Sequence, residues 1–333
     1  MDGTIDEFAL IDRLVGRLRD MDGEDPVLVG IGDDAAVIRH PEGMDLLVTT
    51  DTVVENIHFA KSTMDYPDVG YKAIAVSISD IAAMGGRPQS VVLAFTVPTS
   101  LPIAALESIY DGIDEVCRRY QCRVVGGNLA RCEGPLTITS TVTGVVPHQT
   151  AVLRSGAKPG DVIFVTGDVG SSSAGLAFLQ GNVPMPGDDA VFLTVRHRRP
   201  NPQVFAGEVL REAGATSLND ISDGLASELS EIAKASQVRL RVEADRLPIA
   251  PAVRNFARRS GKDPLSFAWY GGEDYQLVGT APSFAFARAL ARCQSAGVQL
   301  TQIGRVESGD GVVADVDGRL EVLSPGGFNH FRD

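Results

Sequence analysis

Hydrophobic and polar positions along the first half of the chain predict a mixture of strands and helices. Apolar runs predict strands at 27–31, 35–38, 46–50, 90–97, 123–125 and 136–146. Helical spacing predicts helices at 69–84 and 103–120, and Gly85-Gly86 should stop the first of these. A capping box, Thr4-x-x-Glu7, with apolar residues at helical spacing up to Leu18 predicts one more helix near the start.

The second half opens with a turn-rich run at 154–161, which predicts a domain boundary. We therefore expect two domains, 1–149 and 150–333. Beyond the boundary, the pattern predicts strands at 162–166, 275–279 and 300–306, and helices at 171–179, 202–212, 225–235 and 285–293, with a Pro/Gly loop at 184–188. These elements form no regular βαβ series, so we expect an α+β fold with mixed sheets in both domains.

Composition narrows the class of protein. The chain has 333 residues and a net charge of −13, and an acidic chain is a poor binder of nucleic acid or anionic membranes. No apolar stretch is long enough to span a bilayer, and the acidic start is unlike a signal peptide. Its four cysteines form no C-x-x-C pair, and its five histidines complete no zinc pattern. We expect reduced thiols and a cytoplasmic protein.

Acidic residues recur beside glycine, small residues or strand ends. They occur as Asp33-Asp34 in GIGDDAAV, Asp51 after a strand, Asp80 inside an apolar helix, Asp220 and Asp223 in DISDGL, and Glu273-Asp274 after a glycine pair. Taken singly, most have an ordinary interpretation, because Asp33-Asp34 could form a turn, Asp51 could cap one, and Asp220 or Asp223 could cap a helix. Asp80 is the exception, because an isolated carboxylate among apolar neighbours needs a partner. Together these acids indicate oxygen ligands for hard divalent cations such as Mg²⁺, which commonly shares phosphate oxygens with a nucleotide.

Three segments are candidates for binding phosphate. Gly126-Gly127 after a strand could admit a ligand close to the backbone, or form a plain turn. The run at 167–173 leads into a helix whose N-terminus could bind an anion, although ordinary serine capping is the more common arrangement. Arg154 could pair with a phosphate or be a surface arginine. We reject the formal dinucleotide fingerprint at 30–35, because two acids would face the pyrophosphate, and no P-loop or protein-kinase motif is present.

These motifs, in this order, resemble the thiamine-monophosphate kinase family. The matching segments are GIGDDAAV (30–37), TTDTVVENIHF (49–59), YKAIAVSISDIAAMGGRP (71–88), VVGGN (124–128), LRSGAKPGD (153–161), DISDGL (220–225), GGEDYQL (271–277) and the end at 328–331. The resemblance spans essentially the whole chain. The same superfamily includes aminoimidazole-ribonucleotide synthetase, selenophosphate synthetase and a hydrogenase-maturation protein.

The resemblance implies ATP- and Mg²⁺-dependent phosphorylation of thiamine monophosphate to thiamine diphosphate, a step of thiamine biosynthesis. It also implies a homodimer in which the N-terminal sheets of two chains pair into a barrel. That domain would bind ATP and Mg²⁺ and form the dimer, and a C-terminal α+β domain would follow it.

The resemblance also assigns site residues by position. Asp34, Thr49, Thr50, Asp51, Asp80, Asp220 and Asp223 would hold several Mg²⁺ ions. Gly127, Asn128, Arg154, Ser222 and Tyr110 would contact ATP, while His58, Glu273 and Phe328 would contact thiamine monophosphate. Phe328 would offer an aromatic face to a thiamine ring, and Glu273 a counter-charge to the thiazolium. No protein residue is expected to act as nucleophile or general base.

Two positions depart from the family pattern. Asn128 stands where the family usually has Asp, so it keeps a carbonyl oxygen but loses a charge. Asn56, beside His58, is Gly in much of the family. Two other functions therefore remain as alternatives: another ATP-dependent ligase of the superfamily, or a non-catalytic binder of thiamine phosphate.

Overall fold

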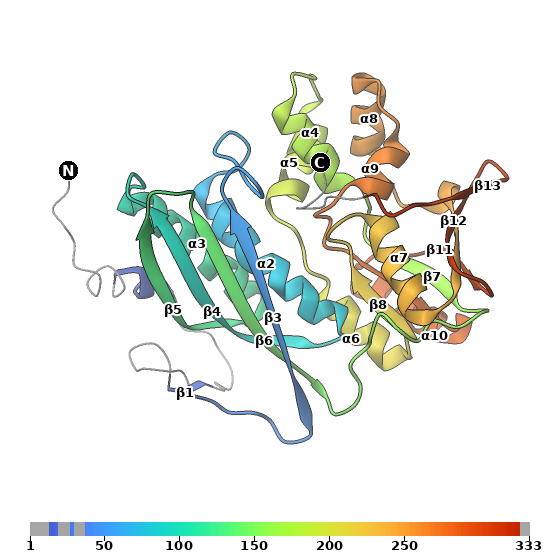
Figure 1. Ribbon diagram of the computed structural model, residues 1–333, viewed down its shortest axis with the longest axis horizontal. Helices are drawn as coiled ribbons and strands as arrows, with labels where there is room; N and C mark the ends of the chain where they lie inside the picture. Colours follow the sequence, from blue (N-terminus) through green and yellow to red (C-terminus); the bar gives the residue numbers. More distant parts are fainter. Residues whose placement is uncertain (1–12, 19–26, 30–36, 327–333) are drawn as a thin grey trace. The chain divides into compact units, whose positions relative to one another are not determined.

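The fold is taken from a computed structural model, which describes residues 13–18, 27–29 and 37–326. The chain divides into two compact units. Unit 1 comprises Met1–Ile81 and Pro88–His148, and unit 2 comprises Ala82–Arg87 and Gln149–Asp333. Each unit has its own sheet and its own helices (Figure 1).

Unit 1 is built on a four-stranded sheet in the order β3-β6-β4-β5. Its strands are β3 (Met44–Val54), β4 (Arg87–Pro98), β5 (Arg123–Cys132) and β6 (Thr137–Pro147), and its two long helices are α2 (Tyr66–Ala83) and α3 (Ile103–Tyr120). The short strands β1 (Val27–Val29) and β2 (Val37–Ile38) form a separate antiparallel pair. β3 and β6 are antiparallel, whereas β4 and β5 are parallel.

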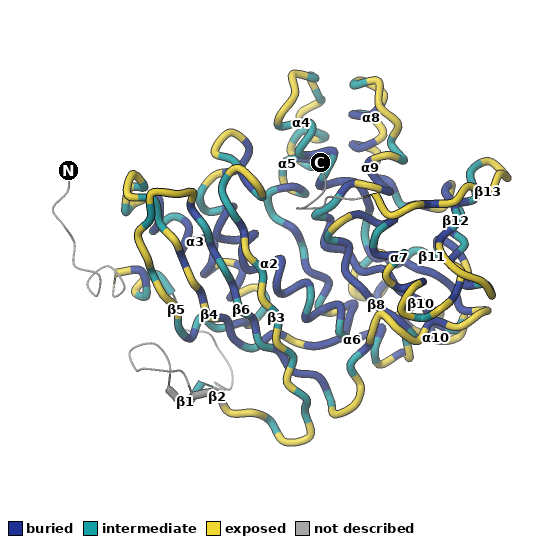
Figure 2. Tube along the Cα trace, viewed as in Figure 1, coloured by how far each residue is buried: buried dark blue, intermediate teal, exposed yellow. Residues whose placement is uncertain are grey.

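The two faces of the unit 1 sheet differ because side chains alternate along each strand. One face is covered by α2 and α3, and side chains on it, such as those of Leu93 and Phe95, are at most 2% exposed. The other face is open, and Figure 2 shows buried and exposed positions alternating along these strands. Gly70 and Gly112 let the two helices approach closely, because a Cβ on either would lie within 2 Å of a backbone oxygen of the other helix or its first turn.

Unit 2 is built on a seven-stranded sheet in the order β13-β12-β9-β11-β7-β10-β8, with one parallel pairing, β12 with β9. The strands are β7 (Val162–Thr166), β8 (Ser217–Asp220), β9 (Arg239–Glu243), β10 (Leu277–Ala281), β11 (Leu300–Glu307), β12 (Gly311–Val316) and β13 (Arg319–Val322). The helices are α4 (Ser171–Gln180), α5 (Gly187–Arg198), α6 (Val204–Ala213), α7 (Leu225–Ser236), α8 (Pro251–Ser260), α9 (Pro264–Tyr270), α10 (Ser283–Ser295) and the 3₁₀ turn η1 (Ala244–Arg246).

β7 is buried on both faces and separates two apolar cores. Ile163 and Val165 face a core shared with α4, α7, α8 and α9. Phe164, on the opposite face, belongs to a core shared with α6 and α10. A continuous apolar strand between two helical layers explains why 162–166 was predictable from the sequence without alternation.

Most expected elements are present, and two expectations are wrong. The strand expected at 123–125 does not end at Gly126-Gly127, because β5 continues to Cys132 in parallel pairing with β4. The Pro/Gly loop expected at 184–188 ends early, since α5 begins at Gly187 directly after Pro186. The expected N-terminal helix lies mostly outside the described residues.

Two features bear on the class of protein. All four cysteines are free. In the part of the chain that the structure describes, no helix is both long and apolar enough to cross a membrane.

Candidate active site

Oxygen-bearing side chains of unit 1 gather where β3 and β6 pack against α2. Thr49 and Asp51 are two residues apart on β3 and so point to the same face, and Ser77 and Asp80 are three residues apart on one face of α2. Thr49 Oγ1 donates to Asp80 Oδ2 at 2.5 Å, and Ser77 Oγ donates to Asp51 Oδ2 at 3.1 Å. The periodicities of β3 and α2 thus bring Asp51 and Asp80, which are far apart in the sequence, into one group of side chains.

The neighbouring strand completes this group, which we call the unit 1 oxygen cluster (Thr49, Asp51, Ser77, Asp80 and Ser140). Ser140 pairs with Asp51 across β6 and β3, and its Oγ lies 2.7 Å from Ser77 Oγ. The Oγ of Ser140 also donates to the Ala73 carbonyl at 2.7 Å, which ties the sheet to α2. Every member offers oxygen, the donor that Mg²⁺ prefers, so the cluster fits a hard cation.

One expected metal ligand of unit 1, Thr50, contributes no side chain to this cluster. The Thr50 side chain points to the opposite, exposed face, where its Oγ1 lies 3.1 Å from Thr141 Oγ1, which leaves only its backbone carbonyl for a ligand at the cluster. Asp34 lies outside the described residues. Among the described residues, no three His, Cys, Asp or Glu side chains are close enough together to hold a metal ion.

β5 carries the glycine pair and Asn128. Gly127 pairs with Leu93 of β4, and a Cβ on Gly127 would lie 2.4 Å from the Leu93 carbonyl oxygen. Glycine is therefore required by the strand pairing itself, and a plain tight turn is the wrong interpretation. Asn128 follows as an exposed residue in the middle of β5.

Tyr110 and His58 have defined local surroundings in unit 1. Tyr110 on α3 is 8% exposed and stacks on Phe95 of β4 at 5.6 Å between ring centroids, and burial raises the pKa of its hydroxyl to about 12. His58 follows β3, and its Nδ1 accepts from the Val54 backbone N–H at 3.1 Å. Asn56 in the same turn has φ +66°, a left-handed conformation that Asn tolerates better than most residues, which accounts for Asn at this position.

In unit 2, the two acidic motifs lie side by side as hydrogen-bonded segments. The backbone N–H of Glu273 donates to the Ser222 carbonyl at 2.7 Å, and that of Tyr275 donates to the Ile221 carbonyl at 2.9 Å. A Cβ on Gly272 would lie 2.5 Å from the Ser222 oxygen, so glycine permits this close approach. Glu273 has φ +67°, and this strained backbone is held in place by the pairing.

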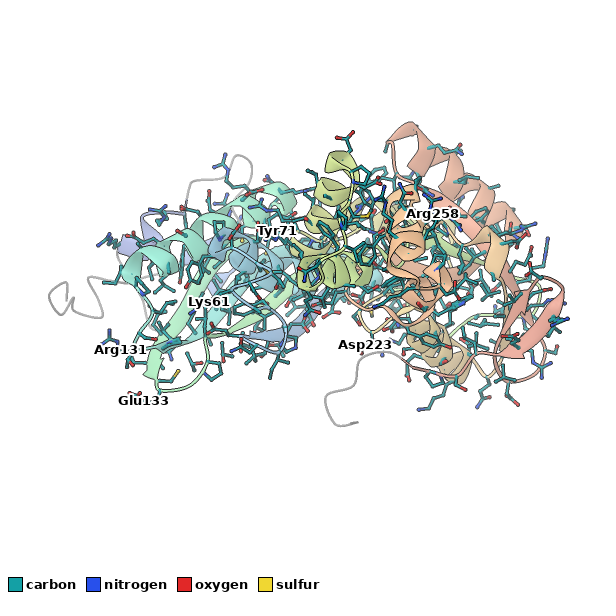
Figure 3. The ribbon with its side chains drawn as sticks, turned by 90° about the horizontal axis from the view of Figure 1, so that it is seen from above. Lys61, Tyr71, Arg131, Glu133, Asp223 and Arg258 are labelled. Atoms are coloured by element: carbon teal, nitrogen blue, oxygen red, sulfur yellow. The ribbon has the colours of Figure 1, made fainter. Side chains whose placement is uncertain are left out.

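The candidate ligands on the DISDG segment differ in burial. Asp220 ends β8 and is 3% exposed, while Ser222 is half-buried. Asp223, labelled in Figure 3, is exposed on the loop that precedes α7. The pattern of acidic residues had predicted Asp220 and Asp223 as candidates, whereas Ser222 was expected only from the family resemblance.

A buried carboxylate that the sequence reasoning missed, Glu228 of α7, organises this segment. Its Oε1 accepts from the Asp223 backbone N–H at 3.0 Å and from Ser222 Oγ at 3.3 Å, and its Oε2 accepts from Asn219 Nδ2 at 2.5 Å. Asn219 Oδ1 in turn accepts from Nε of the exposed Arg154 at 2.9 Å. Burial raises the pKa of Glu228 to about 7, although the Asp223 N–H acts against this. The only sequence signal was a polar residue at a position of α7 that should face the core.

The N-terminus of α4 is already capped by a carboxyl group of the protein itself. Asp274, 7% exposed, accepts from the backbone N–H groups of Gly170 at 2.5 Å and Ser172 at 3.0 Å. The Asp274 carboxylate therefore takes the place considered for a phosphate, and no serine caps the helix. Burial raises the pKa of Asp274 to about 7, while the hydrogen bonds from Ser172 and Gly170 lower it.

Glu273, next to Asp274, approaches the buried His197 of α5. Its Oε2 lies 3.6 Å from His197 Nδ1, and the same nitrogen lies 3.3 Å from Ser172 Oγ. Glu273 remains partly exposed, as a contact to a ligand requires. Phe328 lies outside the described residues.

The expected site residues therefore form two local groups. Unit 1 holds Thr49, Thr50, Asp51, His58, Asp80, Tyr110, Gly127 and Asn128, of which Thr49, Asp51 and Asp80 belong to the oxygen cluster. Unit 2 holds Arg154, Asp220, Ser222, Asp223 and Glu273, linked through Glu228 and the paired backbones.

Comparison with known proteins places this arrangement in a defined class. The family model described as AIR synthase related protein, N-terminal domain, matches residues 32–146, and the corresponding C-terminal domain matches residues 158–317. The fold and the paired acidic segments therefore define a two-domain protein of the AIR synthase-related class.

Full-length relatives identify the family within this class. The chain is 36% identical to thiamine-monophosphate kinase of Bacillus subtilis (98% of this chain and 100% of the relative) and 39% identical to that of Escherichia coli (98% of both). It superposes on the crystal structure of thiamine-monophosphate kinase from Stenotrophomonas maltophilia with a TM-score of 0.83 and 36% identity, covering 93% and 97% of the two chains. A structure of AaThiL complexed with AMPPCP and TMP gives a TM-score of 0.78 and 32% identity over 98% and 97%. The chain belongs to the thiamine-monophosphate kinase family.

Proposed function

We propose that this chain transfers the γ-phosphoryl group of ATP to thiamine monophosphate, forming thiamine diphosphate and ADP. The observation that carries the proposal is the set of acidic segments, the oxygen cluster of β3 and α2 and the paired loops of unit 2, in a chain of this family. Its likeness to AaThiL, solved with AMPPCP and TMP, supports the same pair of ligands.

The proposed roles follow the chemistry of each side chain. Mg²⁺ is held by oxygen atoms of Asp34, Thr49, Thr50, Asp51, Asp80, Asp220 and Asp223. ATP is contacted by Gly127, Asn128, Arg154, Ser222 and Tyr110, and thiamine monophosphate by His58, Glu273 and Phe328. Tyr110 is the most buried of the ATP and thiamine monophosphate contacts that the structure describes, so it can meet a ligand only through the small part of its surface that is exposed.

The proposed reaction is a direct in-line transfer that needs no protein nucleophile. The second pKa of a phosphate ester is about 6, so the acceptor phosphate is already largely ionised near neutral pH. Mg²⁺, when bound, would neutralise phosphate charge and offset the negative field of the acids. Arg154 pairs with a phosphate oxygen, and Glu273 places a negative charge beside the thiazolium. The protein therefore contributes positioning and charge rather than proton transfer.

The proposal includes a cytoplasmic homodimer in which the unit 1 sheets of two chains pair into a barrel. The outward face of the unit 1 sheet supports this, because Leu46 and Val48 of β3 and Val92 of β4 are 44–62% exposed. An apolar sheet face of this kind usually packs against another layer.

An assay with purified protein tests the activity. Mg-ATP and thiamine monophosphate should give equal amounts of ADP and thiamine diphosphate, measured by chromatography. Asp51→Asn should reduce turnover by at least the roughly 10–100-fold cost of disturbing a metal site. Asp45→Asn is the matched control, because Asp45 lies on the same strand but pairs with the exposed His148.

Two other results would overturn the proposal. Release of inorganic phosphate only with an amidine substrate of purine synthesis would indicate the amidine-cyclising ligase. Calorimetric binding of thiamine monophosphate with no product at saturating Mg²⁺ would indicate a non-catalytic binder.

A further inference from the structure

The carboxylate of Glu228 is buried on α7 and bound to three groups that belong to one segment of the chain. It is 5% exposed, and it receives hydrogen bonds from the Asp223 N–H, from Ser222 Oγ and from Asn219 Nδ2. Removing the carboxylate would leave the buried amide of Asn219 and two part-buried donors, Ser222 Oγ and the Asp223 N–H, without this acceptor, which is costly. The side chain therefore fixes the loop between β8 and α7 from behind.

The same carboxylate is connected to Arg154 through a relay of defined polarity. The guanidinium of Arg154 only donates, so the Asn219 atom that faces it must be the amide oxygen. The NH₂ of Asn219 is then the group that faces Glu228, whose Oε2 accepts from it. Glu228 thus sets the orientation of the Asn219 amide, and the amide oxygen holds the exposed guanidinium.

We infer that Glu228 is a positioning residue for nucleotide binding, which holds the Ser222–Asp223 loop directly and orients Arg154 through Asn219. The inference rests on the proposed function, in which Ser222 and Arg154 contact ATP. Glu228 is not among the residues proposed to contact nucleotide or metal, and its effect would reach the nucleotide through these neighbours.

The polarity of the relay makes the inference testable by exchanging its two members. In E228Q one oxygen can still serve the loop, but the new NH₂ group faces the NH₂ of Asn219. If the Asn219 amide rotates to relieve this conflict, it presents NH₂ to Arg154 instead of oxygen. In N219D a second carboxylate meets that of Glu228. In the double variant N219D/E228Q, every donor again faces an acceptor, and the total charge equals that of the wild type.

Calorimetry with Mg-AMPPCP, without thiamine monophosphate, measures the effect apart from catalysis. We expect each single variant to bind about tenfold or more weakly, the usual result of losing a hydrogen bond to a charged group. The double variant should recover to within about threefold of the wild type, as coupled neighbours do. E231Q, an exposed glutamate of the same helix, should bind like the wild type.

Several outcomes would overturn the inference. It fails if E228Q binds the nucleotide as the wild type does, or if the double variant is as weak as the weaker single variant. It also fails if binding changes only in proportion to the melting temperature, because a merely structural role would have that effect. Wild-type protein that binds Mg-AMPPCP but forms no thiamine diphosphate would refute the proposed function and leave this test intact. Wild-type protein that binds no nucleotide would overturn both.

Discussion

Neighbouring residues of β3 have opposite roles because a strand turns alternate side chains to opposite faces. Thr49 points to the oxygen cluster and donates to Asp80, whereas Thr50 points outward to Thr141. A valine side chain has nearly the shape of threonine but no hydroxyl. We expect T49V to raise the Mg²⁺ concentration for half-maximal activity by about tenfold, the order expected for losing a partner of a metal ligand.

T50V is the matched control for this residue-scale prediction. It removes a hydroxyl that lies beside Thr141 on the exposed face and keeps the backbone carbonyl of residue 50, so its Mg²⁺ requirement should stay near that of the wild type. Equal effects of the two substitutions in a Mg²⁺ titration would show that the two faces of β3 are not distinguished in this way.

At the scale of elements, α4 depends on Asp274 for its N-terminal cap. Burial favours the protonated acid, whereas the two backbone N–H groups favour the ionised form. The folded-state pKa of Asp274, about 7, lies above the value of about 3.9 for an unfolded chain. The native state therefore binds the extra proton between these values, and the stability contributed by this group falls as pH rises through the window.

D274N removes this titration. Urea unfolding at pH 5 and pH 8 should show the wild type losing about 2–3 kcal/mol relative to D274N as pH rises, since one pKa unit is about 1.4 kcal/mol. D263N, which alters the exposed cap of α9, should show a constant difference from wild type at both pH values. A constant difference for D274N as well would mean that the helix N–H groups outweigh burial and keep Asp274 ionised.

The elements also show where sequence reasoning succeeds. The helix 103–120 and the strand 162–166 were predicted with the bounds of α3 and β7, because local periodicity and apolar runs determine them. The strand at 123–125 was predicted too short, because pairing with β4 carries β5 through two glycines that locally favour a turn. The whole of α5, which begins directly after Pro186, was missed, and the proline and glycine at its start were interpreted as a loop.

The site residues also differ in whether the sequence alone could reveal them. Asp51 and Asp80 could be found in the sequence, because acids among small or apolar residues are unusual, whereas Thr49 was expected only from the family resemblance. Glu228 and Asn219 could not, because their importance comes from hydrogen bonds between segments and not from any local pattern. Likewise, the sequence offered serine as the cap of α4, while the true cap, Asp274, comes from a hundred residues further along the chain.

At the scale of the whole molecule, several of the acidic residues behind the net charge of −13 are not surface charges. Asp51 and Asp80 lie in the oxygen cluster, and Glu228 and Asp274 are buried and hydrogen-bonded within unit 2. These carboxylates do little for solubility, and the total charge therefore overstates the repulsion that an incoming phosphate would meet at a metal-loaded site.

The proposed homodimer depends on the outward face of the unit 1 sheet. Val48 of β3 is 62% exposed there, and in a twofold dimer each substitution at this position occurs twice in the interface. V48D should raise the dimer dissociation constant on the order of 100-fold or more, because it buries a charge without a partner. V191D is the matched control, since Val191 on α5 is equally exposed at 63% but lies in unit 2. In sedimentation experiments at micromolar protein, the wild type and V191D should be dimers and V48D a monomer. A monomeric wild type would refute the dimer, and a dimeric V48D would mean that the chains associate through another surface.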